Sequence, residues 1–77
     1  MNITLKLYTV LREYLPEDLK EHILSIPDNS KVIDVINILN IPNELPKIIL
    51  INGAQKNPES EISEGDELSM FPPISGG

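Results

Sequence analysis

The residues of this chain best suited to chemistry are the last seven, residues 71–77, which read FPPISGG. Gly76 and Gly77 have no Cβ atom, so their backbone can pass through a narrow channel and another protein's active site can surround the terminal carboxylate. Pro72 and Pro73 each fix φ and favour an extended exit from the domain. The four residues after Pro73 reach about 13–14 Å when extended. A carboxylate on such an arm can be activated as an acyl-adenylate elsewhere and then attacked by a nucleophile.

Side chains elsewhere in the sequence form no recognisable catalytic group. The chain has no cysteine, which excludes disulfides, thiolate metal sites and a cysteine nucleophile. His22 is the single histidine, and the pattern places it in a strand as half-exposed surface. The acidic residues between 59 and 67 lack the spacing of a calcium loop, and the four glycines are too dispersed for a phosphate loop. We therefore expect no bound metal and no bound cofactor, and chemistry that lies in the main chain at the C-terminus.

Length and charge limit the classes of protein to which the sequence can belong. Seventy-seven residues suffice for one domain, and a formal charge of −6 opposes binding to phosphate backbones, so no nucleic-acid partner is expected. The same charge attracts a basic protein partner. No apolar run approaches the roughly 18 residues of a membrane span, and the N-terminal residues lack the features of a signal peptide. We expect a soluble cytoplasmic protein without membrane contact.

The first part of the chain predicts two strands joined by a helical turn. In residues 2–10, apolar side chains alternate with polar or aromatic ones, which indicates a strand with one face in the core. Residues 11–15 give one helical turn that Pro16 ends. Residues 21–27 predict a second strand, and the short connection favours an antiparallel hairpin with the first strand.

Residues 28–42 contain the main helix. Their apolar side chains recur about every three residues and do not alternate, which favours a helix despite their β-branched content. Ser30 or Asn29 is expected to cap the first backbone N–H groups, and Asp34 stands early, where the helix dipole favours an acid. Pro42 is expected to close the helix.

The last part of the chain predicts three more strands. Residues 47–51 are apolar enough for a central strand that is covered on both faces. Residues 52–53, Asn-Gly, are a strong turn signal, and residues 54–56 can return as a short edge strand. Ile62 is expected to fill a small gap in the core from a polar loop. Residues 67–71 form the final strand, which the prolines must end because proline lacks a donor.

These elements predict an α+β protein in which one helix lies across a mixed sheet of four to five strands. The simplest position for the final strand is in the middle of the sheet, beside the first strand and parallel to it. That arrangement is the β-grasp, or ubiquitin-like, fold. Residues 1–73 would form this domain, and residues 74–77 would be a flexible Gly-Gly tail. By itself, a Gly-Gly end is equally compatible with an inert terminus. Because it follows a predicted β-grasp strand and two prolines, we interpret it as functional.

The whole chain resembles the MoaD/ThiS group of ubiquitin-like sulfur carriers, and most closely the small subunits of molybdopterin synthase. The Pro-Pro pair before the tail is typical of the molybdopterin branch. The segments that carry the resemblance are residues 11–13 (LRE), 32–36 (VIDVI), 51–53 (ING), Ile62 with 65–68 (GDEL), and 71–77 (FPPISGG).

The resemblance implies a carrier whose chemistry is performed with other proteins. In this family an activating enzyme uses ATP to adenylate the terminal glycine, and a sulfurtransferase then converts it to a thiocarboxylate. The tail enters the large synthase subunit and delivers sulfur to a pterin precursor. Gly77 would bear the sulfur, and Gly76, which has no side chain, would let the chain end enter a narrow active site. The residues expected to contact partners are Met70, Phe71, Pro72, Pro73, Ile74 and Ser75.

The same resemblance implies that the large subunit supplies the catalytic side chains, and that two carriers flank a large-subunit dimer as a heterotetramer. This chain would then be a carrier and co-substrate rather than a catalyst. Three alternatives stay open from the sequence. The sulfur acceptor can be thiamine or tRNA; the protein can be a modifier joined through Gly77 to lysines of target proteins; or it can be a plain β-grasp binding module with an inert tail.

Overall fold

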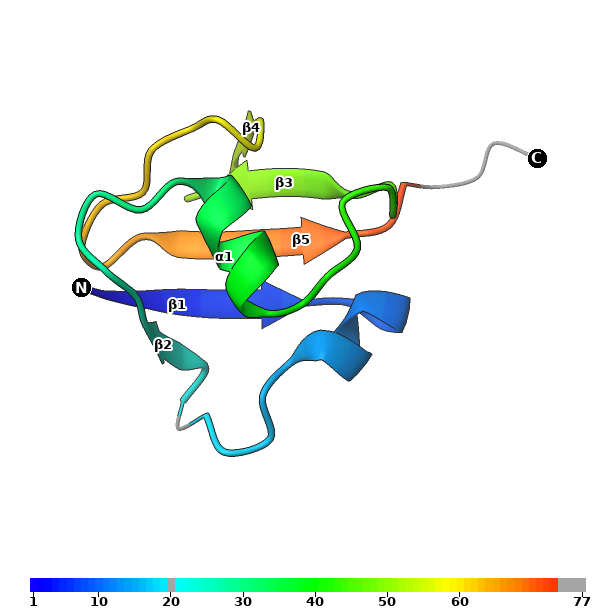
Figure 1. The fold of residues 1–77 in the computed structure, drawn as a ribbon, viewed down its shortest axis with the longest axis horizontal. Helices are drawn as coiled ribbons and strands as arrows, with labels where there is room; N and C mark the ends of the chain where they lie inside the picture. The colour runs from blue at the N-terminus through cyan, green and yellow to red at the C-terminus, as the bar shows by residue number, and fades with distance from the viewer. Residues whose placement is uncertain (20, 74–77) are drawn as a thin grey trace.

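The computed structural model describes residues 1–19 and 21–73, and its framework is one five-stranded mixed sheet (Figure 1). The strands lie in the order β2-β1-β5-β3-β4, with β1 and β5 parallel and every other pair antiparallel. The helix α1 lies across one face of this sheet. The α+β, β-grasp prediction is therefore confirmed. The elements in chain order are β1 (Asn2–Leu7), the 3-10 helix η1 (Thr9–Tyr14), β2 (Ile23–Ser25), α1 (Val32–Ile38), β3 (Ile48–Ile51), β4 (Ala54–Lys56) and β5 (Glu67–Phe71).

The alternation in β1 has the predicted consequence. Ile3, Leu5 and Leu7 are buried beneath α1, and the residues between them point to the other face of the sheet. β5 lies beside β1, with Leu5 opposite Leu68 and the two strands running the same way. A parallel pair needs a long crossover, and the whole segment from β2 to β4, including α1, supplies it. The crossover allows β5 to run parallel to β1, and β5 is central because it also pairs with β3 on its other side.

The helix α1 begins one residue later than a cap at Ser30 implies and two residues later than a cap at Asn29 implies, and neither expected cap is used. The N-cap is Lys31, whose backbone N–H donates to Oδ2 of Asp34 at 2.8 Å. Ser30 instead donates its hydroxyl to the Pro27 carbonyl at 2.6 Å, and Asn29 has a left-handed φ of 64°. Ser30 therefore closes the turn that precedes the helix. The prediction that an acid early in the helix is favourable is consistent with the contact made by Asp34.

The helix also ends earlier than the sequence suggested. Its last residue is Ile38, four residues before the proline that was expected to close it. Asn40 adopts a left-handed φ of 60°, and the Ile41 N–H donates to the Ile36 carbonyl at 3.0 Å. This is the geometry of a helix C-terminus closed by a left-handed residue, which asparagine tolerates better than most.

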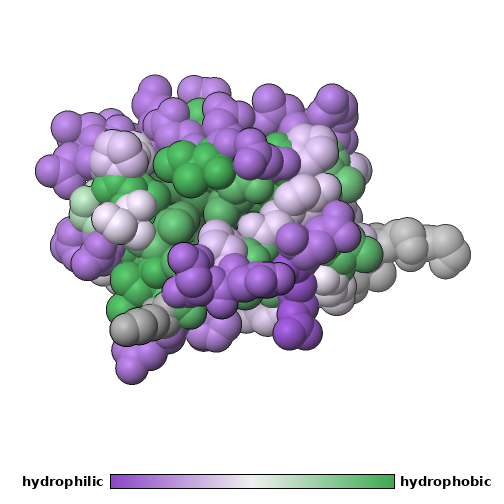
Figure 2. Space-filling view, turned by 60° about the horizontal axis from the view of Figure 1, so that its bottom comes forward, coloured by the Kyte–Doolittle hydropathy of each residue, from purple (hydrophilic) through white to green (hydrophobic). Residues whose placement is uncertain are grey.

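The core between α1 and the sheet is almost entirely aliphatic. Ile62 reaches it from the loop before β5, and the side chain is buried as predicted. Figure 2 shows hydrophobic residues still visible between hydrophilic ones on the side of the molecule that it faces, as expected for a domain too small to cover its core completely. Among the described residues, no helix is both long and apolar enough to cross a membrane.

Two local predictions are wrong. β3 has strand neighbours on both sides, but only its Ile49 and Ile51 side chains are buried, because the helix covers one face of the sheet. The other two residues of β3, Ile48 and Leu50, face outward and are half-buried. His22 lies in the turn before β2, with a left-handed φ of 63°, and is exposed.

Candidate functional site

The C-terminal end of β5 is the structural feature that positions the predicted site. Hydrogen bonds on both sides hold this strand, and the last residue pairs are Leu7 with Met70 on β1 and Ile48 with Phe71 on β3. The strand ends at Phe71, and Pro72 and Pro73 follow outside it. Proline has no N–H group with which to continue the ladder. The middle of the sheet therefore fixes the point at which the chain leaves the domain.

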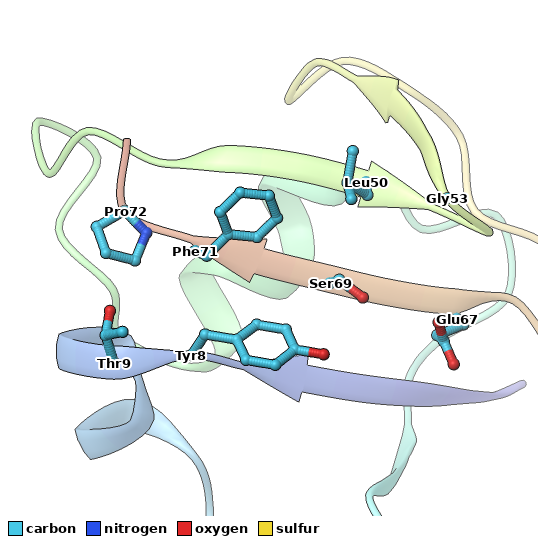
Figure 3. A pocket seen from close by; sticks show the side chains of 8 residues that line it. All are labelled: Tyr8, Thr9, Leu50, Gly53, Glu67, Ser69, Phe71 and Pro72. Atoms are coloured by element: carbon cyan, nitrogen blue, oxygen red, sulfur yellow. The ribbon is translucent and has the colours of Figure 1, made fainter. Parts of the chain in front are cut away.

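Beside this exit, on the sheet face opposite α1, lies an open groove of about 560 Å³ (Figure 3). Two aromatic rings border it: that of Tyr8, directly after β1, and that of Phe71, at the end of β5, with their centroids 6.1 Å apart in an edge-to-face arrangement. Leu50 lies farther along the same face on β3. The groove is lined by Tyr8, Thr9, Leu50, Gly53, Glu67, Ser69, Phe71 and Pro72.

The groove is apolar near the exit and polar at its far end. Near the exit, Phe71 and Pro72 are half-buried, and Tyr8 exposes 44% of its surface. At the other end, Glu67 forms an ion pair with Lys6, with a separation of 3.2 Å between Oε1 and Nζ. An apolar side chain of a partner would therefore fit best beside the exit, where removing the rings from water is favourable.

The predicted contact residues divide into three groups. Phe71, Pro72 and Pro73 are accessible at the exit, as a contact surface requires. Met70 is fully buried on the α1 side of the sheet, so its predicted place in the contact surface is corrected: its side chain belongs to the core. The remaining predicted site residues lie outside the described part of the chain, namely Ile74, Ser75, Gly76 and Gly77.

Of the eight residues that line the groove, sequence reasoning identified only Phe71 and Pro72 as contact residues, and the six that it missed include Tyr8 and Leu50. The alternation of residues 2–8 contains a signal for Tyr8, because it places this ring on the outward side. The uniformly apolar run of residues 48–51 contains no such signal for Leu50, since every position looks equally suited to the core. Only the position of the helix shows which of its residues face outward.

The described residues contain no arrangement typical of a catalytic centre. None of their His, Asp and Glu side chains gather in a group of three that could hold a metal ion. Burial raises the pKa of Tyr14, with a smaller contribution from Glu13, and burial lowers the pKa of Lys47. Neither side chain lines the groove. The lining of the groove is an open, largely apolar surface beside the end of β5, of a kind to which a protein surface can bind.

Several solved structures share this fold. SAMP1 from Haloferax volcanii matches with a TM-score of 0.73 and 22% identity over 100% of both chains. A putative molybdopterin converting factor, subunit 1, from Pyrococcus furiosus matches with a TM-score of 0.73 and 20% identity over 95% of this chain and 98% of that one. A complex of subunits 1 and 2 of molybdopterin-converting factor from Helicobacter pylori matches with a TM-score of 0.58 and 22% identity over 100% of both chains.

These identities are low, so the structural matches establish the ubiquitin-like fold and nothing narrower. No curated protein matches the sequence significantly. The ThiS family model, in contrast, matches residues 5–77, which is almost the whole chain and includes the FPPISGG end. The sequence match and the fold agree, and this chain therefore belongs to the ThiS family.

Proposed function

We propose that this protein is the sulfur carrier of a molybdopterin synthase, acting as its small subunit. The observation that carries the proposal is the exit of β5. A strand held on both sides ends at an accessible Phe71 and continues into Pro72-Pro73 and a terminal Gly-Gly. The likeness to molybdopterin converting factor subunits supports the same reading.

The proposed chemistry takes place at the carboxylate of Gly77. An activating enzyme joins this carboxylate to the adenylyl group of ATP and releases pyrophosphate. A sulfurtransferase and a thiol reductant then supply sulfur at the sulfide level, which attacks the acyl carbon of Gly77; the C–S bond forms as the bond to AMP breaks, and the terminal carboxylate becomes a thiocarboxylate. Gly76, without a side chain, lets both enzymes surround the reacting carbon. The carrier has no cysteine, and in this scheme it needs none because the terminal carbonyl carbon holds the sulfur.

The groove beside the exit would be the surface of the carrier to which the large subunit binds. Phe71 and Tyr8 supply rigid aromatic surface, which is the residue class that dominates binding energy at protein interfaces. A partner seated there draws the tail into its own active site, where its side chains transfer sulfur to the pterin precursor. The expected assembly is a heterotetramer with two carriers around a large-subunit dimer.

A second candidate function is conjugation to other proteins. The match to SAMP1, which a second solved structure describes as small archaeal modifier protein 1, favours it as strongly as the fold favours the first candidate. The adenylation of Gly77 is common to both, and only the nucleophile differs: a sulfur donor in one case and a lysine amine in the other. Thiamine and tRNA are further acceptors for the same thiocarboxylate.

The deciding experiment is the intact mass of the protein after incubation with ATP, a cognate activating enzyme and a sulfur donor. We expect a mass increase equal to replacement of one oxygen by one sulfur, and no increase when Gly77 is deleted. The sulfurated protein is then mixed with a cognate large subunit and the pterin precursor, and molybdopterin is measured. An unchanged mass with a demonstrably active enzyme system contradicts the carrier function. Sulfuration without molybdopterin formation redirects the search to another acceptor, and adducts of Gly77 with lysine establish conjugation.

A further inference from the structure

A second hollow, of about 300 Å³, lies beside the groove and has a different chemical character. Tyr8 lines both, so the hollow continues the surface that begins at the exit of β5. It is formed by the end of β1, by η1 and by the turn before β2. Its lining residues are Lys6, Leu7, Tyr8, Arg12, Leu15 and His22.

This hollow collects positive charge on a protein whose formal charge is −6. It contains the chain's single arginine and its single histidine. Lys6 is already paired with Glu67, whereas Arg12 forms no ion pair with any of the described residues. Glu13 and Glu21 are the acidic residues adjacent to Arg12 and His22 in sequence, but neither lines the hollow. The five N–H donors of the Arg12 guanidinium are therefore available to an incoming anion.

The backbone holds these side chains in place with unusual conformations. Glu21 and His22 have consecutive left-handed φ values of 52° and 63°. Such values are unfavourable for a residue other than glycine, so the surrounding structure must hold them. The His22 carbonyl accepts from the Leu5 N–H at 2.7 Å, which fixes the turn to β1. At η1, the Leu15 N–H donates to the Arg12 carbonyl at 3.1 Å and fixes the other wall of the hollow.

We propose that this hollow receives a carboxylate side chain of the partner protein that occupies the groove. Arg12 provides a planar pair of donors that matches a carboxylate, and the imidazole N–H of His22 adds a further donor. The partner chemistry is thus an acidic residue placed next to an apolar one, the apolar residue packing on Tyr8 and Phe71. The inference rests on the proposed function, because it takes the large synthase subunit as that partner.

Two features favour a protein carboxylate over a free anion. The hollow is open, and Arg12 and His22 are exposed, so a small anion would stay largely in water and bind weakly. A carboxylate on a docked protein is instead held close by the contacts in the groove and pays little additional entropy. The net negative charge of the chain repels an acidic partner surface in general. The positive charge of the hollow attracts such a surface locally and so directs it to this part of the chain.

The test compares a charge reversal in the hollow with one at the distant edge of the sheet. Affinity of the full chain for a cognate large subunit is measured by calorimetry for wild type, Arg12→Glu and Lys56→Glu, at low and moderate salt. Lys56 lies on β4 at the far edge of the sheet and gives the same change in net charge. We expect Arg12→Glu to weaken binding at least tenfold and Lys56→Glu less than threefold. The thermal midpoint of each variant, and the neutral variant Arg12→Gln, show that the loss is not a loss of folding.

The outcomes separate this inference from the function on which it rests. Equal effects of Arg12→Glu and Lys56→Glu overturn the carboxylate site and leave the carrier function intact. A wild-type chain that is sulfurated but does not bind the large subunit overturns both the synthase assignment and this inference. Inorganic phosphate is titrated into the isotope-labelled free chain as a further probe. Saturable shifts of Arg12 and His22 below about millimolar phosphate would identify a free-anion site and overturn the docking proposal.

Discussion

The two faces of the sheet differ sharply although the same strands build both. On the face under α1, one row of side chains across β1, β5 and β3 is apolar and buried. The neighbouring row, one residue away along each strand, lies on the opposite face and points outward. The buried row is Leu7, Met70 and Ile49, and the outward row is Lys6, Ser69 and Leu50. A shift of one residue in register would move the buried side chains of a strand to the outward face. Burial of the first row therefore determines which residues face outward in the second.

This difference separates the residues that make the fold from those that meet partners. The buried row contributes through removal of apolar surface from water, at about 25 cal/mol per Å². The outer face keeps aromatic rings half-exposed beside the exit and charges farther away, which is costly for solubility unless another protein covers the rings. Variants on the two faces should therefore have opposite profiles of stability and binding.

The largest effect is expected for Leu68→Ala on the buried face. Leu68 is fully buried between β1 and β3, and its truncation leaves a cavity that the sheet cannot close. The free energy of unfolding should fall by about 3 kcal/mol, a large share of the about 4–12 kcal/mol expected for a chain of this length. Urea denaturation measures it. A loss below about 1 kcal/mol would show that the core is less tightly packed than the structure indicates.

On the outer face, Phe71→Ala should show the reverse profile. We expect partner binding to weaken by about tenfold or more, because a half-buried ring at the exit is removed, while the free energy of unfolding changes by less than about 1 kcal/mol. Calorimetry against the large subunit and urea denaturation measure the two quantities. Ile38→Ala is the matched control, since Ile38 is an apolar residue of α1 that is 47% exposed. If the control weakens binding equally, the groove is not the contact surface.

A smaller effect is expected for Gly53→Ala in the turn that joins β3 to β4. Gly53 has a φ of +85°, and an added Cβ would meet nothing within 4 Å. The variant should therefore lose about 1 kcal/mol of stability through backbone strain alone, with partner affinity unchanged. Thermal denaturation and the binding assay test both parts. A clear loss of affinity at unchanged stability would extend the contact surface to this end of the groove.

The smallest effect is expected for Lys6→Met, which removes the ion pair with Glu67. Both side chains are more than 40% exposed, so water screens the pair and it contributes less than about 0.5 kcal/mol. Stability measured by urea denaturation should be nearly unchanged. A loss above about 1 kcal/mol would mean that this pair organises the outer face and is not merely a feature of its surface.

Strand alternation and turn chemistry made most of the fold predictable. The alternation of Ile3, Leu5 and Leu7 indicated which face of the first strand is buried, and the Asn52-Gly53 turn indicated the β3–β4 hairpin, because both signals act over a few neighbouring residues. The cap of α1 was not predictable in the same way. Asn29 and Ser30 suit a cap equally well by residue type, and only the hydrogen bond of Ser30 to the Pro27 carbonyl shows that the turn uses it.

By itself the sequence determined the candidate chemistry of this protein and the order of its elements. Main-chain chemistry needs no assembled side chains, so the FPPISGG end could be interpreted without a structure. Tertiary structure decided the surface around it. It placed Met70 in the core, brought Tyr8 against Phe71 and turned Leu50 outward, since these depend on which face the helix covers. Residues far apart in sequence form the groove and the basic hollow only when β5 lies between β1 and β3.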